Sequence, residues 1–250
     1  MPDQISRRAA LQQAAAIVGG TTLATVTGSA VLSPQAFAAP APDPTDTGAA
    51  LRRHKAEHDR VFTGKPSKNG WGMEKVTNDG GTIWTRPIPG SPLDDVTMRI
   101  GDVAIVLVHI VRRFHYEIDE LRRGDVVGWR SPDQLRKNLA ESNQASGTGV
   151  QIRPRFYPSG SRGGHFPQDL VVVRDILADC GGTVRWGGDD RHPDEALFYI
   201  DVDPGDARLP QVAAKFRGWA QAPGQGAGAI SDPLQPQRRR AAQRLARQQS

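Results

Sequence analysis

Hydrophobic and polar residues recur with different periods along this chain, and each period predicts an element of secondary structure. Residues 49–62, AALRRHKAEHDRVF, have helical character. Residues 70–100 place turn residues between short β-prone pieces, which predicts hairpins or an extended arm. The mostly apolar residues 101–111 predict a buried helix, and the alternation of apolar and polar side chains in residues 112–121 predicts that a strand follows it.

The second half of the chain alternates between short strands and longer amphipathic segments. Residues 125–139 predict a short strand, a turn and the beginning of a helix. After them come a strand that begins at Gly149, an amphipathic helix over residues 168–178 and a strand that contains Arg185-Trp186. A last helix is predicted over about residues 209–219 by one apolar stripe, which consists of Leu209, Val212, Ala213, Phe216 and Trp219.

Composition divides the chain into a folded centre and two ends. The 250 residues, 38% of them hydrophobic, are enough for one domain of ordinary size with a core. Residues 39–48 predict a Pro-rich linker, and residues 49–222 predict the domain. Residues 223–250 predict a Gly- and Pro-rich linker that ends in a basic tail. We expect a single α+β domain, with a small antiparallel sheet flanked by helices.

Residues 1–38 have the pattern of an export signal. Ser6-Arg7-Arg8 is followed by no charged residue until Asp43, and the stretch closes with the small-x-small triplet Ala36-Phe37-Ala38. The paired arginines resemble those of twin-arginine signals, which export folded proteins. A permanent membrane anchor is the alternative, but the many Thr and Gly residues make the stretch weakly apolar for one. We expect cleavage after Ala38 and a location outside the cytoplasm: extracellular, periplasmic or on the cell wall.

Positive charge is concentrated at the carboxyl end. The five arginines of residues 236–250, with no acid among them, equal the formal net charge of the whole chain, +5. The domain is therefore close to neutral, which argues against a specific nucleic-acid partner. The tail suits nonspecific attraction to anionic wall polymers or lipid head groups, and a solvated or weakly helical end without a partner is the alternative.

Cysteine and histidine usage limits the metal chemistry. Cys180 is the only cysteine, so the chain forms no internal disulfide and no thiolate zinc site. Residues 54–58, HKAEH, match the H-x-x-E-H pattern of some zinc peptidases. They lie on a highly charged segment beside the signal, so a solvated helix face explains them better. We interpret His109 and His115 as structural residues.

Four short pieces then follow in a fixed order: Gly128-Trp129-Arg130-Ser131, residues 142–151 with the sequence SNQASGTGVQ, Trp186-Gly187-Gly188, and residues 194–198 with the sequence DEALF. Their order and spacing resemble bacterial zinc peptidases of the D-Ala-D-Ala carboxypeptidase, dipeptidase and L-alanyl-D-glutamate endopeptidase group. Those enzymes carry G-Y-R-S-x-x-x-Q, S-x-H-x-x-G-x-A-x-D, W-G-G and acid-x-x-H-F. The resemblance spans roughly residues 101–222, and the first piece departs from the family's spacing to its glutamine.

The resemblance implies a peptidase-like fold and assigns roles to individual positions. Gln144, Gln151 and Leu197 stand where the family has its His, Asp and His zinc ligands. Asp194 corresponds to the general base, and Arg130 is the weaker match to the arginine that stabilises the oxyanion. Ser142 and Trp186 are the remaining residues that the resemblance places in the cleft.

The donor atoms predict that the inherited zinc site is lost. Leucine has no donor atom, and a neutral glutamine oxygen is a poor substitute for the Cys, His, Asp and Glu donors of zinc sites. Without the ion, nothing lowers the pKa of the attacking water, and we expect no cofactor and little peptidase activity. We expect that a polar cleft remains. In it, Arg130 would pair with a carboxylate of a peptidoglycan stem peptide or other wall polymer, and Trp186 would form an apolar wall.

Three alternatives stay open. The first is an active metallopeptidase with a displaced metal site, built from His165, His192 and either Asp194 or Glu195. The second is a structural wall protein held by its basic tail. The third is that residues 142–149 are an ordinary polar loop and the family assignment is wrong.

Overall fold

The computed structural model describes residues 44–229 and 232–249. The predicted export signal and the first residues of the predicted linker lie outside them. Within the described ranges, no helix combines the length and the apolar character needed to span a membrane. The first element is helix α1, Pro44–Val61, so helical structure starts inside the predicted linker rather than near residue 49. Residues 51–60 are all exposed, as expected for a solvated helix.

Two antiparallel hairpins follow α1; the second lies within residues 70–100, where hairpins were predicted, and the first begins earlier, at Phe62. Strand β1, Phe62–Pro66, pairs with β2, Gly72–Glu74, through a bulged register. Strand β3, Ile83–Arg86, pairs with β4, Val96–Arg99, in a regular register. The short β-prone pieces of residues 70–100 therefore belong to two small two-stranded sheets.

Helix α2, Asp102–Glu117, is longer than the sequence predicted. The strand expected within residues 112–121 is wrong, because Phe114 continues the buried helical stripe of Leu107 and Ile110 at spacings of three and four residues. The apparent alternation arose because Arg113, which the pattern treats as solvent-facing, is buried against acidic side chains.

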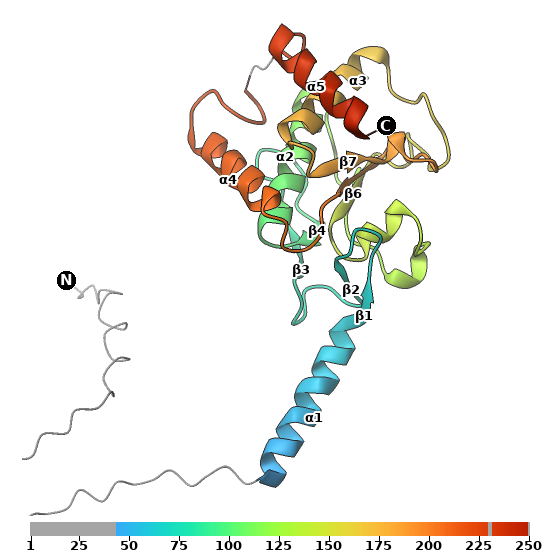
Figure 1. The fold of residues 1–250 in the computed structure, drawn as a ribbon, viewed down its shortest axis with the longest axis vertical. Coiled ribbons are helices and arrows are strands. Elements are labelled where there is room, and N and C mark those ends of the chain that lie inside the picture. Colours follow the sequence, from blue (N-terminus) through green and yellow to red (C-terminus); the bar gives the residue numbers. More distant parts are fainter. Residues whose placement is uncertain (1–43, 230–231, 250) are drawn as a thin grey trace, which may run out of the picture. The chain divides into compact units, whose positions relative to one another are not determined.

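A four-stranded antiparallel sheet forms the centre of the fold, with strand order β5-β6-β8-β7 (Figure 1). Its strands are β5, Val126–Val127; β6, Gly149–Ile152; β7, Val184–Trp186; and β8, Leu197–Ile200. The predicted strands at residue 149 and at residues 185–186 are confirmed. The helix predicted to begin within residues 125–139 is only the short 3-10 helix η2, Pro132–Gln134.

Helices α3, Pro167–Asp179, and α4, Arg208–Gln221, confirm the two amphipathic helices that the sequence predicts. The main core packs side chains of α2, α3 and α4 against the central sheet. Cys180 lies in this core, where burial raises the pKa of its thiol. The described residues thus form a single α+β domain with small antiparallel sheets.

The basic carboxyl end is part of the domain, which corrects the expectation of a free tail after residue 223. Residues Pro236–Gln249 form helix α5, which packs against α3 (Figure 1). Ala242 and Leu245 are buried on its inner side, and Arg238 forms an ion pair with Asp175 of α3 at 2.6 Å. These buried apolar side chains and this ion pair hold α5 against α3, although the composition of the segment predicts that it is solvated.

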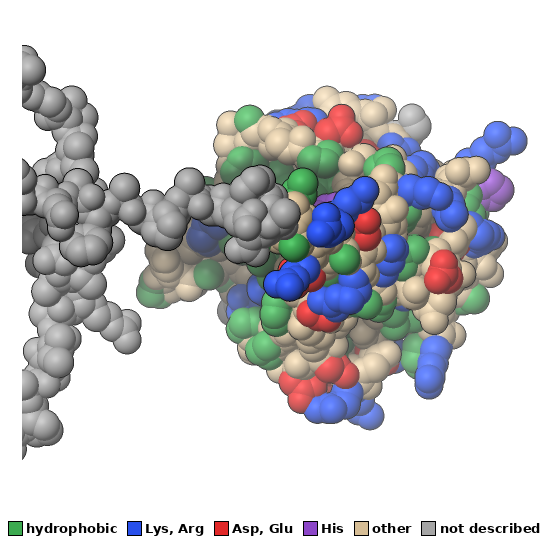
Figure 2. Space-filling model, turned by 90° about the horizontal axis from the view of Figure 1, so that it is seen from below, with side chains coloured by type: hydrophobic (Ala, Val, Ile, Leu, Met, Phe, Trp, Pro, Cys, Tyr) green, Lys and Arg blue, Asp and Glu red, His purple; other side chains and the backbone are tan. Residues whose placement is uncertain are grey.

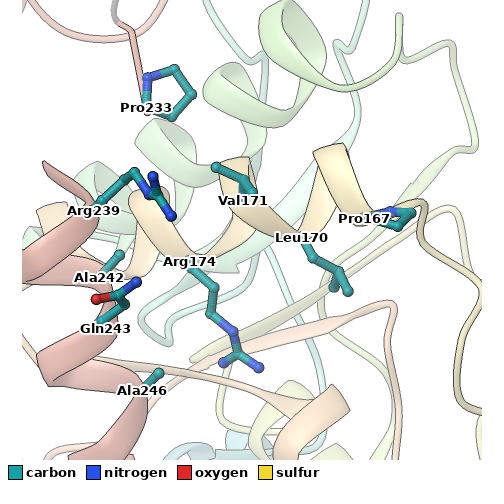
Figure 3. Close-up of a pocket in the computed structure, with 9 residues that line it drawn as sticks. All are labelled: Pro167, Leu170, Val171, Arg174, Pro233, Arg239, Ala242, Gln243 and Ala246. Atoms are coloured by element: carbon teal, nitrogen blue, oxygen red, sulfur yellow. The ribbon is translucent and has the colours of Figure 1, made fainter. Parts of the chain in front are cut away.

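A small cavity of about 230 Å³ lies between α3 and α5. Figure 3 shows Arg239 of α5 extending toward α3, on which Val171 and Arg174 are drawn. Outside this interface, Lys and Arg side chains are interspersed with Asp and Glu on the face of the molecule in Figure 2. The face drawn there is therefore not a continuous positive surface of the kind that nucleic acids favour.

Candidate functional site

Two of the three positions that the resemblance assigns to zinc ligands are paired on the central sheet, and the third is hydrogen-bonded to its edge strand. Gln151 of β6 pairs directly with Leu197 of β8, and on its other side with Val127 of β5. Residues paired across antiparallel strands project from the same face of a sheet. Gln144 ends the 3-10 helix η3, Ala140–Gln144, and its Nε2 donates hydrogen bonds to the carbonyl oxygens of Val127, at 3.0 Å, and Gly128, at 2.8 Å.

Asp194 joins this group through a buried hydrogen bond. Its Oδ2 accepts a bond from Nε2 of Gln151 at 2.7 Å, and its Oδ1 accepts one from the backbone N–H of Ala196 at 3.2 Å. Burial raises the pKa of the Asp194 carboxyl above its ordinary value, and the charge of Glu141 raises it further. The hydrogen bond from Gln151 opposes this shift without cancelling it.

Two charged side chains, Glu141 and Arg136, interact electrostatically with the buried Asp194 carboxyl. Nε of Arg136 donates to Oε1 of Glu141 at 2.8 Å, and this hydrogen bond lowers the pKa of the Glu141 carboxyl. The Arg136 side chain itself is 65% exposed to solvent. The charge of Arg130, which is half-buried, also acts on Glu141. Sequence reasoning found Arg130 but missed Glu141 and Arg136, although Glu141 directly precedes the family-like segment.

The small polar side chains of residues 142–148 have partners within the fold. Ser142 Oγ donates to the carbonyl of Leu139 at 2.8 Å and accepts the N–H of Lys68 at 3.0 Å. Oγ of Ser146 is 2.8 Å from Oγ of Ser67. These bonds attach the segment to the turn between β1 and β2, so the polarity of Ser142 reflects a buried structural network. The sequence holds no signal for this pairing, because the partners are more than 70 residues away.

Trp186 is a core residue. Its side chain is only 3% exposed, and Nε1 donates to the carbonyl oxygen of Glu195 at 2.8 Å. The ring lies so close to Gly188 that a Cβ there would overlap it, which explains the small residue after Trp186-Gly187. Trp186 therefore offers almost no surface to a ligand, contrary to the expected apolar cleft wall. Leu197, at 1% exposure, is likewise enclosed, against Ala140 and Tyr199.

The residues at the family's metal positions do not fit zinc. Two neutral amides and one alkyl group stand there, and Nε2 of each amide is already a hydrogen-bond donor to oxygen. Oε1 of Gln144 is buried and has no hydrogen-bond partner among the described residues. A single amide oxygen is not a zinc-binding set, because such sites use imidazole, thiolate and carboxylate donors. The side chains at these three positions are therefore unsuited to hold a zinc ion.

The residues of the displaced metal site do not converge. The ring of His165 is buried and stacks on Tyr157 at 4.0 Å, while the carboxylate of Glu195 accepts the backbone N–H groups of Gly163 and Gly164 at 2.7 and 2.8 Å. His192 is exposed on a loop. Among the residues described, no group of three or more His, Cys, Asp and Glu side chains is placed to hold a metal ion, and this includes residues 54–58.

The raised pKa of Asp194 predicts a component of stability that depends on pH. The ordinary pKa of an aspartate carboxyl is 3.8. The stability that protonated Asp194 contributes is therefore fully present below about pH 3.8 and is lost as the pH rises through the raised pKa of the folded state. Asp194→Asn stays neutral, and Gln151 can turn its amide to keep a hydrogen bond. We expect the variant to gain stability relative to the parent chain between about pH 4 and pH 7, as measured by urea unfolding.

The difference in the free energy of unfolding between the parent chain and Asp194→Asn isolates the effect of Asp194, because the other titrating groups are present in both proteins. Asp201, whose pKa burial also raises, is one of them. Parallel stability profiles over this pH range would show that Asp194 is ionised in the folded protein as readily as in the unfolded one.

Comparison with known proteins adds no relative: no family model matches this chain, and neither does any curated protein or solved structure.

Proposed function

We propose that this chain is an exported, zinc-free protein with a D-Ala-D-Ala-peptidase-like fold that binds peptidoglycan stem peptides without cleaving them. The observation that carries the proposal is the pairing of Gln151 with Leu197 on the central sheet, with Asp194 hydrogen-bonded to Gln151 and Gln144 hydrogen-bonded to the neighbouring strand. Motif order in the sequence assigns these positions to one site, and these contacts support that assignment. Localisation on the wall rests on the signal-like residues 1–38.

Hydrolysis is not expected from this arrangement. A general base must reach an activated water, whereas Asp194 is only 4% exposed and its carboxyl is held by Gln151 and by the backbone N–H of Ala196. The side chains at the three positions are unsuited to bind a metal ion, which in the family would lower the pKa of that water. The amide of Gln151 supplies a neutral hydrogen-bond partner where the family has a metal-bound carboxylate, so the buried polar group stays paired without a metal.

Recognition is assigned to a charged rim that consists of Arg130, Arg136 and Glu141. Arg136 is hydrogen-bonded to Glu141, whereas Arg130 acts on Glu141 through its charge and forms no hydrogen bond or ion pair with a described side chain. The guanidinium of Arg130 can donate two parallel hydrogen bonds to a carboxylate, which is the strong, bidentate form of this interaction. Stem peptides carry such carboxylates at side chains and at the carboxyl terminus. The peptide is therefore expected to lie on the rim, with the buried Gln151–Asp194 pair beneath it as a support.

The test is isothermal titration of the full chain with a synthetic stem pentapeptide that ends in D-Ala-D-Ala. We expect saturable binding without release of D-Ala, and a loss of about tenfold or more in affinity for Arg130→Gln, which removes a charge-assisted pair. Arg155→Gln is the matched control, because Arg155 is exposed and lies outside the rim. Equal affinity of the two variants, or no binding to the parent chain, would refute the proposal.

A further inference from the structure

A second, larger cavity lies on another part of the domain. It has a volume of about 690 Å³, within the range of small-molecule pockets, which is roughly 300–1,000 Å³. Its walls come from α2, from α4, from the turn after β3 and from the segment that follows α4. None of the residues that the resemblance assigns to the peptidase-like site lines it.

One wall of this cavity is aromatic. His109 of α2 stacks on Phe216 of α4 with ring centroids 3.7 Å apart, and Phe216 contacts Trp219 at 5.3 Å. Ile105 and Val108 continue the apolar surface along α2. Burial lowers the pKa of His109, so its ring is a neutral part of this wall near pH 7. The wall suits a flat or branched apolar group.

The charged side chains that line the cavity are all positive. Arg86, Arg112 and Arg217 reach the cavity from three different elements, and no Asp or Glu lines it. Arg217 is paired with Asp102 at 2.9 Å, whereas Arg112 donates a hydrogen bond to the backbone carbonyl of Ala227 at 3.2 Å and forms no ion pair with a described acidic residue. Nε of Arg86 and Nε of Arg112 are buried and have no hydrogen-bond partner among the described residues. These two nitrogens are closed to a ligand, but both side chains are partly exposed at the cavity and neither forms an ion pair with an acidic side chain among the described residues, so their other N–H groups can donate to an anionic ligand.

From these features we infer that the cavity between α2 and α4 binds a small organic carboxylate with an apolar body. The apolar group lies against His109, Phe216 and Trp219, and the carboxylate accepts hydrogen bonds from Arg86 and Arg112. The site needs no metal and is separate from the Gln151–Asp194 region. It predicts a second, independent ligand for this protein.

The probes are 4-phenylbutyrate and its neutral amide, 4-phenylbutyramide, titrated calorimetrically into the full chain. They share the apolar body and differ in charge, so the pair isolates the role of the arginines. We expect saturable binding of the acid and about tenfold or weaker binding of the amide. Arg86→Gln and Arg112→Gln, tested separately, are each expected to reduce the affinity for the acid by a similar factor, and Arg155→Gln to leave it unchanged.

A cavity-filling variant keeps the inference testable if an arginine variant fails to fold. Ala220 lines the cavity from an exposed position on α4, so Ala220→Trp is expected to block it while preserving the helix. Binding of the stem pentapeptide to this variant should be unchanged, which separates failure of this inference from failure of the proposed function. Equal binding of acid and amide, no saturable binding, or undiminished binding to Ala220→Trp would overturn the inference.

Discussion

The triple variant Gln144→His, Gln151→Asp, Leu197→His is expected to bind close to one zinc ion per chain after dialysis, whereas the parent chain is expected to bind none. Paired residues such as Gln151 and Leu197 have Cβ atoms about 4.5–5.5 Å apart in antiparallel sheets. Gln144 is hydrogen-bonded to Val127, the residue paired with Gln151 on the other side. Two imidazoles, one carboxylate and a water form a typical catalytic zinc site. Bound metal is measured by mass spectrometry.

The matched control keeps Leu197 and carries only Gln144→His and Gln151→Asp. Two protein donors hold zinc much more weakly than three, so this variant is expected to lose the ion on dialysis. Circular dichroism of each variant establishes that it is folded. A folded triple variant that stays metal-free would show that the three side chains do not converge, and the peptidase-like assignment would lose its main support.

Replacing Arg113 by methionine is expected to lower the free energy of unfolding by about 3–5 kcal/mol, the usual cost of removing one partner from a buried ion pair. The Arg113 side chain is 2% exposed and pairs with Asp175 at 2.9 Å, with Asp179 at 2.7 Å and with Glu117. Burial alone lowers the pKa of this guanidinium, but these acids outweigh it and raise the pKa. Without Arg113, the buried carboxylate of Asp175 keeps only Arg238 of α5 as a cationic partner.

Urea unfolding measures this effect, and Arg123→Met is its control. Arg123 also forms an ion pair, with Asp94, but both side chains are more than half exposed. Exposed pairs contribute about 0–1 kcal/mol, so the same substitution should have little effect there. If both variants lost the same small amount of stability, the cluster around Arg113 would be no stronger than a surface pair.

The accuracy of the sequence predictions depended on whether an element is held by local pattern or by distant partners. Helices α3 and α4 were predicted closely, because their apolar residues recur with a helical period and their inner faces pack on one core. The end of α2 was missed, because a buried Arg113 imitates the polar position of a strand. Helix α5 was taken for a tail, because its docking depends on two buried apolar residues and on acids of α3.

The sequence by itself determined the chemistry available at the candidate site. Gln144, Gln151 and Leu197 lack the donors of a zinc site whatever their positions, and their places in two of the family-like pieces assigned them to one site. The tertiary structure alone decided that Gln151 bonds to Asp194, that Trp186 is enclosed, and that Arg86 and Arg112 face one cavity. These relations join residues far apart in the chain, and only the packing of the folded domain sets their distances and their access to solvent.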